Sequence, residues 1–421
     1  MGSAMSQLQS PQKAASPLSR STPWASLRPF LLLFALLYAA FGAASPFMPA
    51  LMSAKGLSSE QIGLMFGLAT AVRLVSAPIA GRVADRANAL RTVLAVCCVA
   101  CAMVALGYLP ATGFALLLMI GLLHALALAP TTNLADALAL VSAQRQGFEY
   151  GWVRGAGSAA FIVASILAGW TIAGFGLHAV VVLQASLMLA VPLMLWRIPP
   201  VRPSVSSAPF DRKGLAELIG LPVFRRVVLV AALILGSHAL HDTFSLIRWT
   251  HAGISSQTAS MLWSLAVAAE VVVFFFVGPW FVERFGAAHT MAFAALVAAL
   301  RWLVSALTLD LWAILLIQPL HGITFALLHL ACMRVLGMTV PPQLAATAQA
   351  IYGTLGIGAT SALLTMLSGW LYARMGASAF LVMSGLCLAA VPFSLSLKGL
   401  QSQEREGHLH ATRNSSSQSV V

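Results

Sequence analysis

Long apolar runs dominate the chain between Leu31 and Leu397, and short polar gaps interrupt them at intervals of roughly thirty residues. Runs such as 30–48, 93–109 and 180–196 leave no room for the polar face that a soluble helix needs. A helix crosses the hydrocarbon core of a bilayer with roughly 20 apolar residues, and this pattern repeats about twelve times. Lipid admits only helices or closed barrels, and these runs are too long for barrel strands. We therefore expect an all-α membrane protein.

The composition agrees with a membrane protein. Hydrophobic residues make up 59% of the 421 residues and charged residues only 9%, whereas soluble domains have about 25% charged residues. The net charge of +12 does not indicate a nucleic-acid partner, because the basic residues lie in the gaps. Eighteen of the 24 Lys and Arg residues fall in every second gap and at the chain ends. Three fall in the remaining gaps, and three lie within runs. The positive-inside rule then places both termini in the cytoplasm and requires an even number of spans.

The polar stretches divide the chain into five parts. We expect two six-helix bundles, residues 28–197 and 223–397, joined by a Pro-rich cytoplasmic linker at 198–222. Residues 1–27 and 398–421 are polar and Ser-rich, and we expect both to be disordered cytoplasmic tails. Duplicated bundles with a binding site between them are the architecture of many secondary transporters.

A short pattern occurs in both halves: a Gly near a helix end, followed four to six residues later by an acid and an Arg. The copies are Gly81, Asp85 and Arg86 after the second run, with Arg91 further on, and Gly278, Glu283 and Arg284 after the eighth. The first copy resembles the loop 2–3 signature of the major facilitator superfamily. Asn88 stands where that signature has its second Gly.

Four further segments resemble the phenylpropionate permease branch of this superfamily, which is related to the lactose and nucleoside proton symporters. They are residues 149–158, 262–270, 300–302 and 321–325. The resemblance covers residues 28–397. It implies twelve transmembrane helices in two bundles and a multi-pass protein of the bacterial inner (plasma) membrane. It also implies a monomer without cofactors that binds a small-molecule substrate and protons and draws its energy from the proton gradient.

Six ionisable residues fall within or near the apolar runs: Arg73, Asp136, Arg154, Asp242, Glu270 and Arg301. Each costs roughly 2.5–3.5 kcal/mol at mid-bilayer, so together they cost on the order of 15–20 kcal/mol before pairing. Such residues are tolerated where they face water or an opposite charge. We therefore expect a polar path between the helices.

In the first half, Arg73 and Asp136 allow two interpretations. They can form a structural ion pair, or Asp136 can lie near the cytoplasmic interface. Alternatively both can bind substrate, because the guanidinium fork of Arg73 matches a carboxylate in two parallel bonds. Arg154 starts the fifth run, where its side chain can reach the interface, and we interpret it as a gating or structural residue.

In the second half, Glu270, Arg301 and His321 occupy three successive runs. Desolvation favours the neutral form of a buried carboxyl group and a neighbouring Arg favours the charged form, so together they permit reversible protonation. We predict Glu270 as the proton-carrying acid, Arg301 as its charge partner and a substrate-binding residue, and His321 as a relay. The alternative is a static Glu–Arg pair beside a core histidine. The lactose symporter pattern has an acid where this chain has Thr324.

His238, His241 and Asp242 lie together in the seventh run. The His-x-x-His spacing admits a metal, but no third ligand stands out. We instead predict a polar patch in which His238 and Asp242 face substrate, and we predict no metal. His124 and His329 are interpreted as core or cavity-lining residues.

The loop residues Asp85, Arg86 and Arg91 are predicted to gate the cytoplasmic side. An acid beside the end of a neighbouring helix can latch that side through charge and dipole contacts. The alternative is a determinant of topology alone.

These features favour a proton-coupled importer of a small organic solute, such as an aromatic monocarboxylate like phenylpropionate. A sugar or nucleoside symporter is the first alternative. Drug efflux is disfavoured, because the fifth run has Gly155, Gly157 and Ser158 without the proline of efflux members. None of the four lysines follows a glycine, so the chain has no phosphate-binding G-x-x-x-x-G-K-[ST] loop. A membrane-embedded enzyme is the remote alternative.

Overall fold

The computed structural model describes residues 23–199 and 212–398, and every regular element in these two stretches is a helix. The first stretch contains α1 (Pro23–Ala44), α2 (Met48–Ala54), α3 (Ser59–Arg86), α4 (Leu90–Leu106), α5 (Phe114–Gln146), α6 (Tyr150–Phe175) and α7 (Ala179–Leu195). The second begins with α8 (Arg212–Gly220), α9 (Pro222–Gly236), α10 (His238–His251), α11 (Ser256–Val272), α12 (Gly278–Phe285) and α13 (Ala287–Leu307). It continues with α14 (Leu311–Ile317), α15 (Leu320–Gly322), α16 (Leu328–Thr339), α17 (Ala345–Ile351), α18 (Thr360–Met375) and α19 (Ala379–Leu395).

Most of the two predicted tails and the middle of the predicted linker lie outside the described residues. Helix α1 begins at Pro23, inside the predicted tail of residues 1–27. Helix α8 occupies most of the described end of the predicted linker at 198–222.

The helices coincide within a few residues with the apolar runs of the sequence. In the described chain, nine helical segments are long and apolar enough to cross a membrane, and two shorter apolar helices, α4 and α7, accompany them. One of the nine, Pro342–Leu395, is 54 residues long and contains both α18 and α19. The prediction of an all-helical, multi-pass membrane protein is confirmed.

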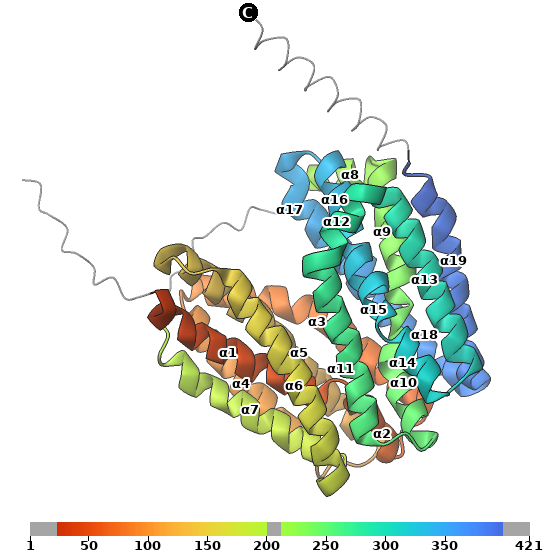
Figure 1. The fold of residues 1–421 in the computed structure, drawn as a ribbon. Helices are drawn as coiled ribbons and strands as arrows, with labels where there is room; N and C mark the ends of the chain where they lie inside the picture. The colour runs from red at the N-terminus through yellow and green to blue at the C-terminus, as the bar shows by residue number, and fades with distance from the viewer. Residues whose placement is uncertain (1–22, 200–211, 399–421) are drawn as a thin grey trace, which may run out of the picture.

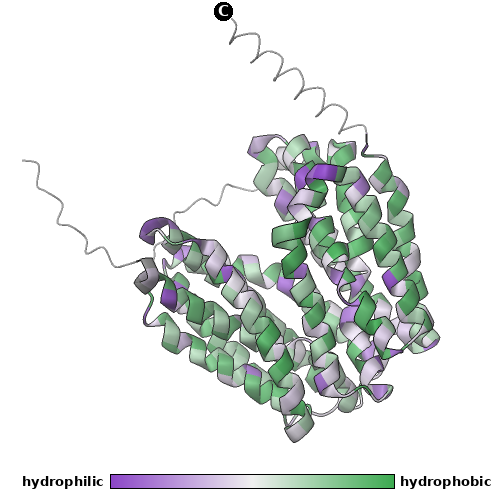
Figure 2. Ribbon diagram, viewed as in Figure 1, coloured by the Kyte–Doolittle hydropathy of each residue, from purple (hydrophilic) through white to green (hydrophobic). Residues whose placement is uncertain are grey.

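The outer surface of the helices is apolar. Large hydrophobic side chains such as Phe175, Phe276 and Leu316 are mostly exposed, with 83%, 75% and 74% of their surface accessible. Figure 2 shows hydrophobic residues along the length of the helices and the more hydrophilic ones scattered among them and near the helix ends. A monomeric soluble protein rarely exposes so much contiguous apolar surface, whereas lipid tails cover it without penalty.

The helices form two groups (Figure 1). Helices α1 to α7 pack mainly on one another, and α9 to α19 do the same. Contacts between the groups are made mainly by α3 with α18, by α6 with α11 and by α2 with α10.

Glycines bring the two groups into backbone contact where α3 and α11 begin and where α6 and α18 end. A Cβ atom on Gly63 would lie 2.6 Å from the Cα of Gly369, and one on Gly169 would lie 2.6 Å from the carbonyl oxygen of Ser256. The Ser256 hydroxyl donates a hydrogen bond to the Gly169 carbonyl at 2.9 Å. Small residues at such crossings let helix backbones approach closely within a membrane.

The turn between α3 and α4 explains the residue that departs from the superfamily signature. Asn88 has a φ of 49°, which is in the left-handed region. Glycine adopts this region without strain, and asparagine is among the few other residues that adopt it readily. Asn88 therefore preserves the backbone turn for which the signature uses Gly.

Three segments of the second group have π-helical backbone: η1 (Val273–Val277), η2 (Ile323–Leu327) and η4 (Tyr352–Ala359). Single-turn π-helical bulges occur frequently at functional sites. Here η1 begins three residues after Glu270 and η2 two residues after His321.

Candidate functional site

A cavity of about 410 Å³ lies between the two helix groups. Its first wall comes from α1, α2, α3, α5 and α7, and its second wall from α9, α10, α11 and α18. The volume is within the range of pockets that bind small molecules. The side chains that can form hydrogen bonds in its lining are Ser45, Thr70, Arg73, Tyr108, His124, Gln184, Asp242, Thr243, Trp263, Ser361 and Thr365.

Arg73 supplies the positive charge of the first wall. It projects from α3, and no carboxylate pairs with it in the part of the chain that the structure describes. Two buried atoms in the same wall, Nε2 of His124 and Oε1 of Gln184, make no hydrogen bond of good geometry among the described residues, although the two side chains interact with each other. Buried polar atoms are usually paired, so this wall offers hydrogen-bonding capacity to a bound molecule.

The second group contains a polar network centred on Arg301, which is fully buried (0% exposed) on α13. Its Nη2 donates to Oε1 of Gln318 at 3.2 Å. Its Nη1 lies 3.2 Å from Nδ1 of His321, and Nη2 lies 3.5 Å from Nε2 of His241. The guanidinium also lies over the Trp302 ring, 4.6 Å from its centroid. These contacts hold a buried cation whose desolvation would otherwise be costly.

The network fixes the tautomers of two histidines. A guanidinium only donates hydrogen bonds, so Nδ1 of His321 and Nε2 of His241 accept. In a neutral imidazole the other nitrogen then carries the proton. For His321 that nitrogen is Nε2, which faces Oε2 of Glu270 at 3.4 Å. For His241 it is Nδ1, which donates to Oδ1 of Asp242 at 3.2 Å.

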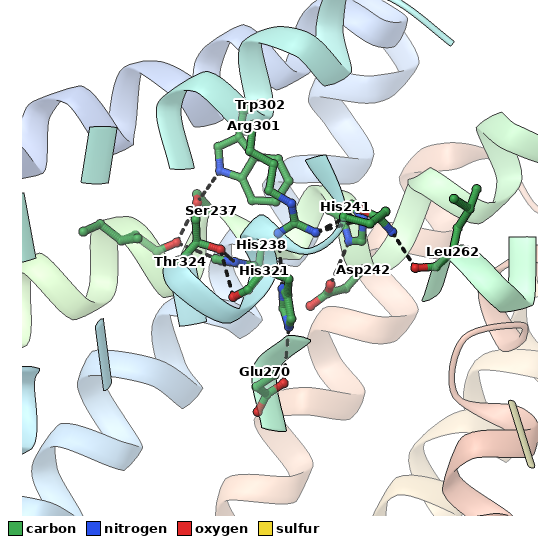
Figure 3. Close-up of polar contacts among 12 residues, drawn as sticks. Ser237, His238, His241, Asp242, Leu262, Glu270, Arg301, Trp302, His321 and Thr324 are labelled. Carbon is green, nitrogen blue, oxygen red and sulfur yellow. Dashed lines mark hydrogen bonds and ion pairs between the residues drawn. The ribbon is translucent and has the colours of Figure 1, made fainter. Parts of the chain in front are cut away.

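One guanidinium therefore orients two imidazoles, and each imidazole faces a carboxylate (Figure 3). Glu270 was expected to pair directly with Arg301, but the ring of His321 lies between them. The side chain of Asp242 is 55% exposed and lines the cavity, and that of Glu270 is 31% exposed.

His238 is held separately from this chain of contacts. Its Nδ1 lies 3.0 Å from the carbonyl oxygen of Ile234, which can only accept. Its Nε2 lies 3.0 Å from Oγ1 of Thr324, the residue at the position of the lactose symporter acid. Both ring nitrogens of His238 have protein partners, as do those of His241. Over residues 23–199 and 212–398, no group of three or more His, Cys, Asp or Glu side chains could hold a metal ion.

In the first group, Asp136 has partners other than Arg73. The Tyr150 hydroxyl donates to Oδ1 of Asp136 at 2.7 Å, and Nη1 of Arg154 lies 4.0 Å from the same oxygen. Arg154 also lies over the ring of Tyr38, 4.8 Å from its centroid. An ion pair between Arg73 and Asp136 is therefore not what the structure shows. The charge of Arg154 also acts on Glu270, across the contact between α6 and α11.

The three loop residues that were predicted to gate lie at the ends of α3 and α4. Arg91 donates to the carbonyl oxygen of Ile198 at 2.7 Å, which ties α4 to the residues that follow α7. Asp85 and Arg86 make no side-chain hydrogen bond or ion pair with the rest of the described chain. A gating role for the three residues stays a prediction.

The structure thus brings Arg301, His321, Glu270, His241 and Asp242 into one network and places Arg73 on the opposite wall of the cavity.

Two glutamines of the site, Gln184 and Gln318, were not singled out from the sequence. A neutral amide inside an otherwise apolar helix is a weaker signal than a charge, yet its burial also requires partners. Applying that signal to the apolar runs would have identified both.

Three comparisons relate the chain to known proteins. Residues 26–382 match the sequence family described as the MFS_1 like family. The chain is 30% identical over 377 residues to the "Probable 3-phenylpropionic acid transporter" of Escherichia coli (strain K12), covering 88% of this chain and 97% of that protein. It is 25% identical over 359 residues to the maltose permease of Geobacillus stearothermophilus, covering 85% and 91% of the two chains. The crystal structure of the nucleoside transporter NupG superimposes with a TM-score of 0.75 at 17% identity, covering 89% of this chain and 98% of that one.

Proposed function

The chain belongs to the MFS_1 like family of transporters and is not an enzyme, and from this we propose that it imports a small organic anion together with protons. The proposed substrate is an aromatic monocarboxylate such as 3-phenylpropionate. The proposed location is the inner (plasma) membrane of a bacterium, where the protein works as a monomer and the proton gradient supplies the energy.

The proposed topology has twelve spans with both termini in the cytoplasm. Short helices α4 and α7 would each cross the membrane, as would α18 and α19 separately. The distribution of Lys and Arg supports this orientation. The close contacts of Gly63 with Gly369 and of Gly169 with Ser256 would then lie on the extracellular side.

The observation that carries the proposal is the placement of unpaired charge around the cavity. Arg73 faces the cavity without a carboxylate partner among the described residues, and it can bind a substrate carboxylate in two parallel hydrogen bonds. Trp263 lines the opposite wall and offers a ring for an aromatic group. The name of the Escherichia coli relative agrees with this substrate class.

Proton coupling is proposed to use Glu270 and His321. An acid that faces a tautomer-fixed imidazole can gain or lose a proton while its geometry is maintained. Arg301 would hold His321 in place, and His238 would support that ring through an edge-to-face contact with 5.3 Å between ring centroids.

Alternating access would come from rocking of the two helix groups about the cavity. The contacts of α3 with α18 and of α6 with α11 would open as the opposite side closes. Asp85, Arg86, Arg91 and Arg154 are proposed to take part in closing the cytoplasmic side.

A sugar or nucleoside symporter is the second candidate, favoured by the neutral hydrogen-bonding groups of the cavity and by the names of two similar proteins. Neutral polar substrates would use Gln184, Thr243 and Thr365 in place of a charge on Arg73.

The test is uptake into proteoliposomes with an acidic exterior. Radiolabelled 3-phenylpropionate, maltose and a nucleoside are compared, each with and without a protonophore. We expect accumulation of 3-phenylpropionate that the protonophore abolishes. Accumulation of only the sugar or nucleoside would support the second candidate, and accumulation indifferent to the protonophore would exclude proton coupling.

A further inference from the structure

Two chains of contacts, here called arms, run from Arg301 through an imidazole to a carboxylate. Only one of the two arms reaches the cavity. The arm through His321 ends at Glu270, which is not part of the cavity lining. The arm through His241 ends at Asp242, which lines the cavity. The two arms place two carboxylates around a single buried guanidinium, so the cluster has one more acid than base.

We propose that Asp242 is a second proton site, which takes up a proton when a carboxylate substrate binds in the cavity. The proposal rests on the proposed function and assigns to Asp242 a role different from that of a direct substrate ligand. Glu270 would carry the proton that drives transport, and Asp242 would carry the proton that makes the cavity receptive to an anion.

The charge distribution across the cavity favours this proton site. Arg73 lines one wall and Asp242 the other, and both face the same volume of about 410 Å³. A substrate carboxylate drawn to Arg73 brings a second negative charge into this space. Two carboxylates in one site disfavour each other's charged form, so a proton is taken up by one of them. The substrate carboxylate is stabilised by Arg73, so the proton goes to Asp242.

The groups that face Asp242 leave it without a cation of its own. On its own helix these groups are His238 and His241, and from α13 and α15 they are Arg301 and His321. Glu270 on α11 acts on it with a like charge. Arg73 and His124 face it across the cavity, while α18 contributes the uncharged Ser361 and Thr365. Arg301 is shared with the other carboxylate and contacts His241 rather than Asp242 itself. No cation is therefore dedicated to Asp242 within the described residues.

The two acids act on each other through their charges, but they cannot exchange a proton through Arg301. A guanidinium remains protonated in proteins, so Arg301 cannot pass a proton from one arm to the other. It can only orient the two imidazoles and act on both acids through its charge. Replacing one acid therefore leaves the protonation of the other measurable.

The experiment measures proton uptake on binding to the purified full-length protein. 3-Phenylpropionate is added in weak buffer with a pH indicator, and its affinity is measured by calorimetry at several pH values. We expect the wild type to take up one proton per substrate bound, with the affinity falling by about tenfold per pH unit where Asp242 is ionised. Asp242→Asn should bind with an affinity independent of pH and take up no proton. Glu270→Gln should still take up a proton on binding, over a pH range shifted downward because the like charge of Glu270 is lost.

Three results would overturn the proposal: binding to the wild type without proton uptake, proton uptake that persists in Asp242→Asn, or loss of binding in a folded Asp242→Asn protein at every pH. Thermal unfolding establishes whether the variants are folded. If the Asp242→Asn protein is not folded, Asp242→Ser replaces it. If the wild type binds no carboxylate at all, the proposed substrate class fails instead.

Discussion

The guanidinium of Arg301 orients His321 with Nη1 3.2 Å from Nδ1 of the ring, and it does not touch the carboxylate on the far side of that ring. Because Nδ1 accepts, the N–H of the neutral ring points away from Arg301 and towards Glu270. An uncharged imidazole therefore separates the buried cation from the acid that was predicted to pair with it. A direct ion pair would hold Glu270 in its charged form, whereas this arrangement leaves it able to accept a proton.

Replacing Glu270 by glutamine should separate exchange from accumulation. The amide cannot release a proton, so we expect loss of proton-driven accumulation with substrate exchange across the membrane retained. Uptake into proteoliposomes with and without a pH gradient, alongside counterflow, measures both. Glu217→Gln, an exposed acid on α8, is the matched control and should behave as the wild type. Unchanged accumulation in Glu270→Gln would remove Glu270 from the coupling mechanism.

Replacing Arg301 by lysine should lower stability although the charge is kept. An ammonium group cannot reproduce the fork that serves His321, His241 and Gln318, so at least one buried acceptor loses its donor. We expect a loss of about 1–3 kcal/mol in the free energy of unfolding. Thermal unfolding in detergent measures it, with the exposed Arg284→Lys as control. Equal melting temperatures of the two variants would show that the fork is not needed.

Replacing Arg73 by glutamine should weaken binding of carboxylates selectively. A charge-assisted hydrogen bond contributes about 1.5–3 kcal/mol, which corresponds to at least about tenfold in affinity. Calorimetry with 3-phenylpropionate should show this loss, while Arg82→Gln, at an exposed position of the same helix, should not. If 3-phenylpropionate binds equally well to Arg73→Gln, its carboxylate is bound elsewhere.

Replacing Gly169 by alanine should force α6 and α11 apart. The new methyl group would lie 2.6 Å from the Ser256 carbonyl oxygen and would also meet the Ser260 side chain, so backbone must move. We expect slower transport and greater labelling of a cysteine introduced at Ser256. Gly174→Ala on the same helix meets no atom within 4 Å and serves as control. Similar labelling in both variants would contradict a close contact at Gly169.

The turn at Asn88 should tolerate glycine but not valine. Its φ of 49° is accessible to glycine, whereas a β-branched residue is strained there by roughly 1–2 kcal/mol. Asn88→Val should therefore melt at a lower temperature than the wild type, and Asn88→Gly at a similar or higher one. The reverse order would show that the Asn88 side chain, not its backbone, is what the turn requires.

Much of the architecture could be read from the apolar runs, because the cost of exposing polar backbone to lipid acts on every segment independently. Helices α4 and α7 coincide with the apolar runs 93–109 and 180–196 within a few residues. The individual pairings could not be read in the same way. The rotation of each helix about its axis and the crossing of helices distant in sequence decide which side chains meet. Arg301 and His241 are sixty residues apart in the chain and nevertheless share a contact.

Local composition was therefore enough to establish a multi-pass helical membrane protein and to single out Glu270, Arg301, His321 and Asp242 as polar groups inside it. Hydrophobicity is summed along the chain and does not depend on the neighbours that a residue finds in space. Only the tertiary structure placed His321 between Arg301 and Glu270. It also brought Tyr150 and Arg154 into contact with Asp136, and it placed Arg73 across a cavity from Asp242. The energy of a buried charge depends on the position of its partners, and those positions exist only after the two helix groups have packed.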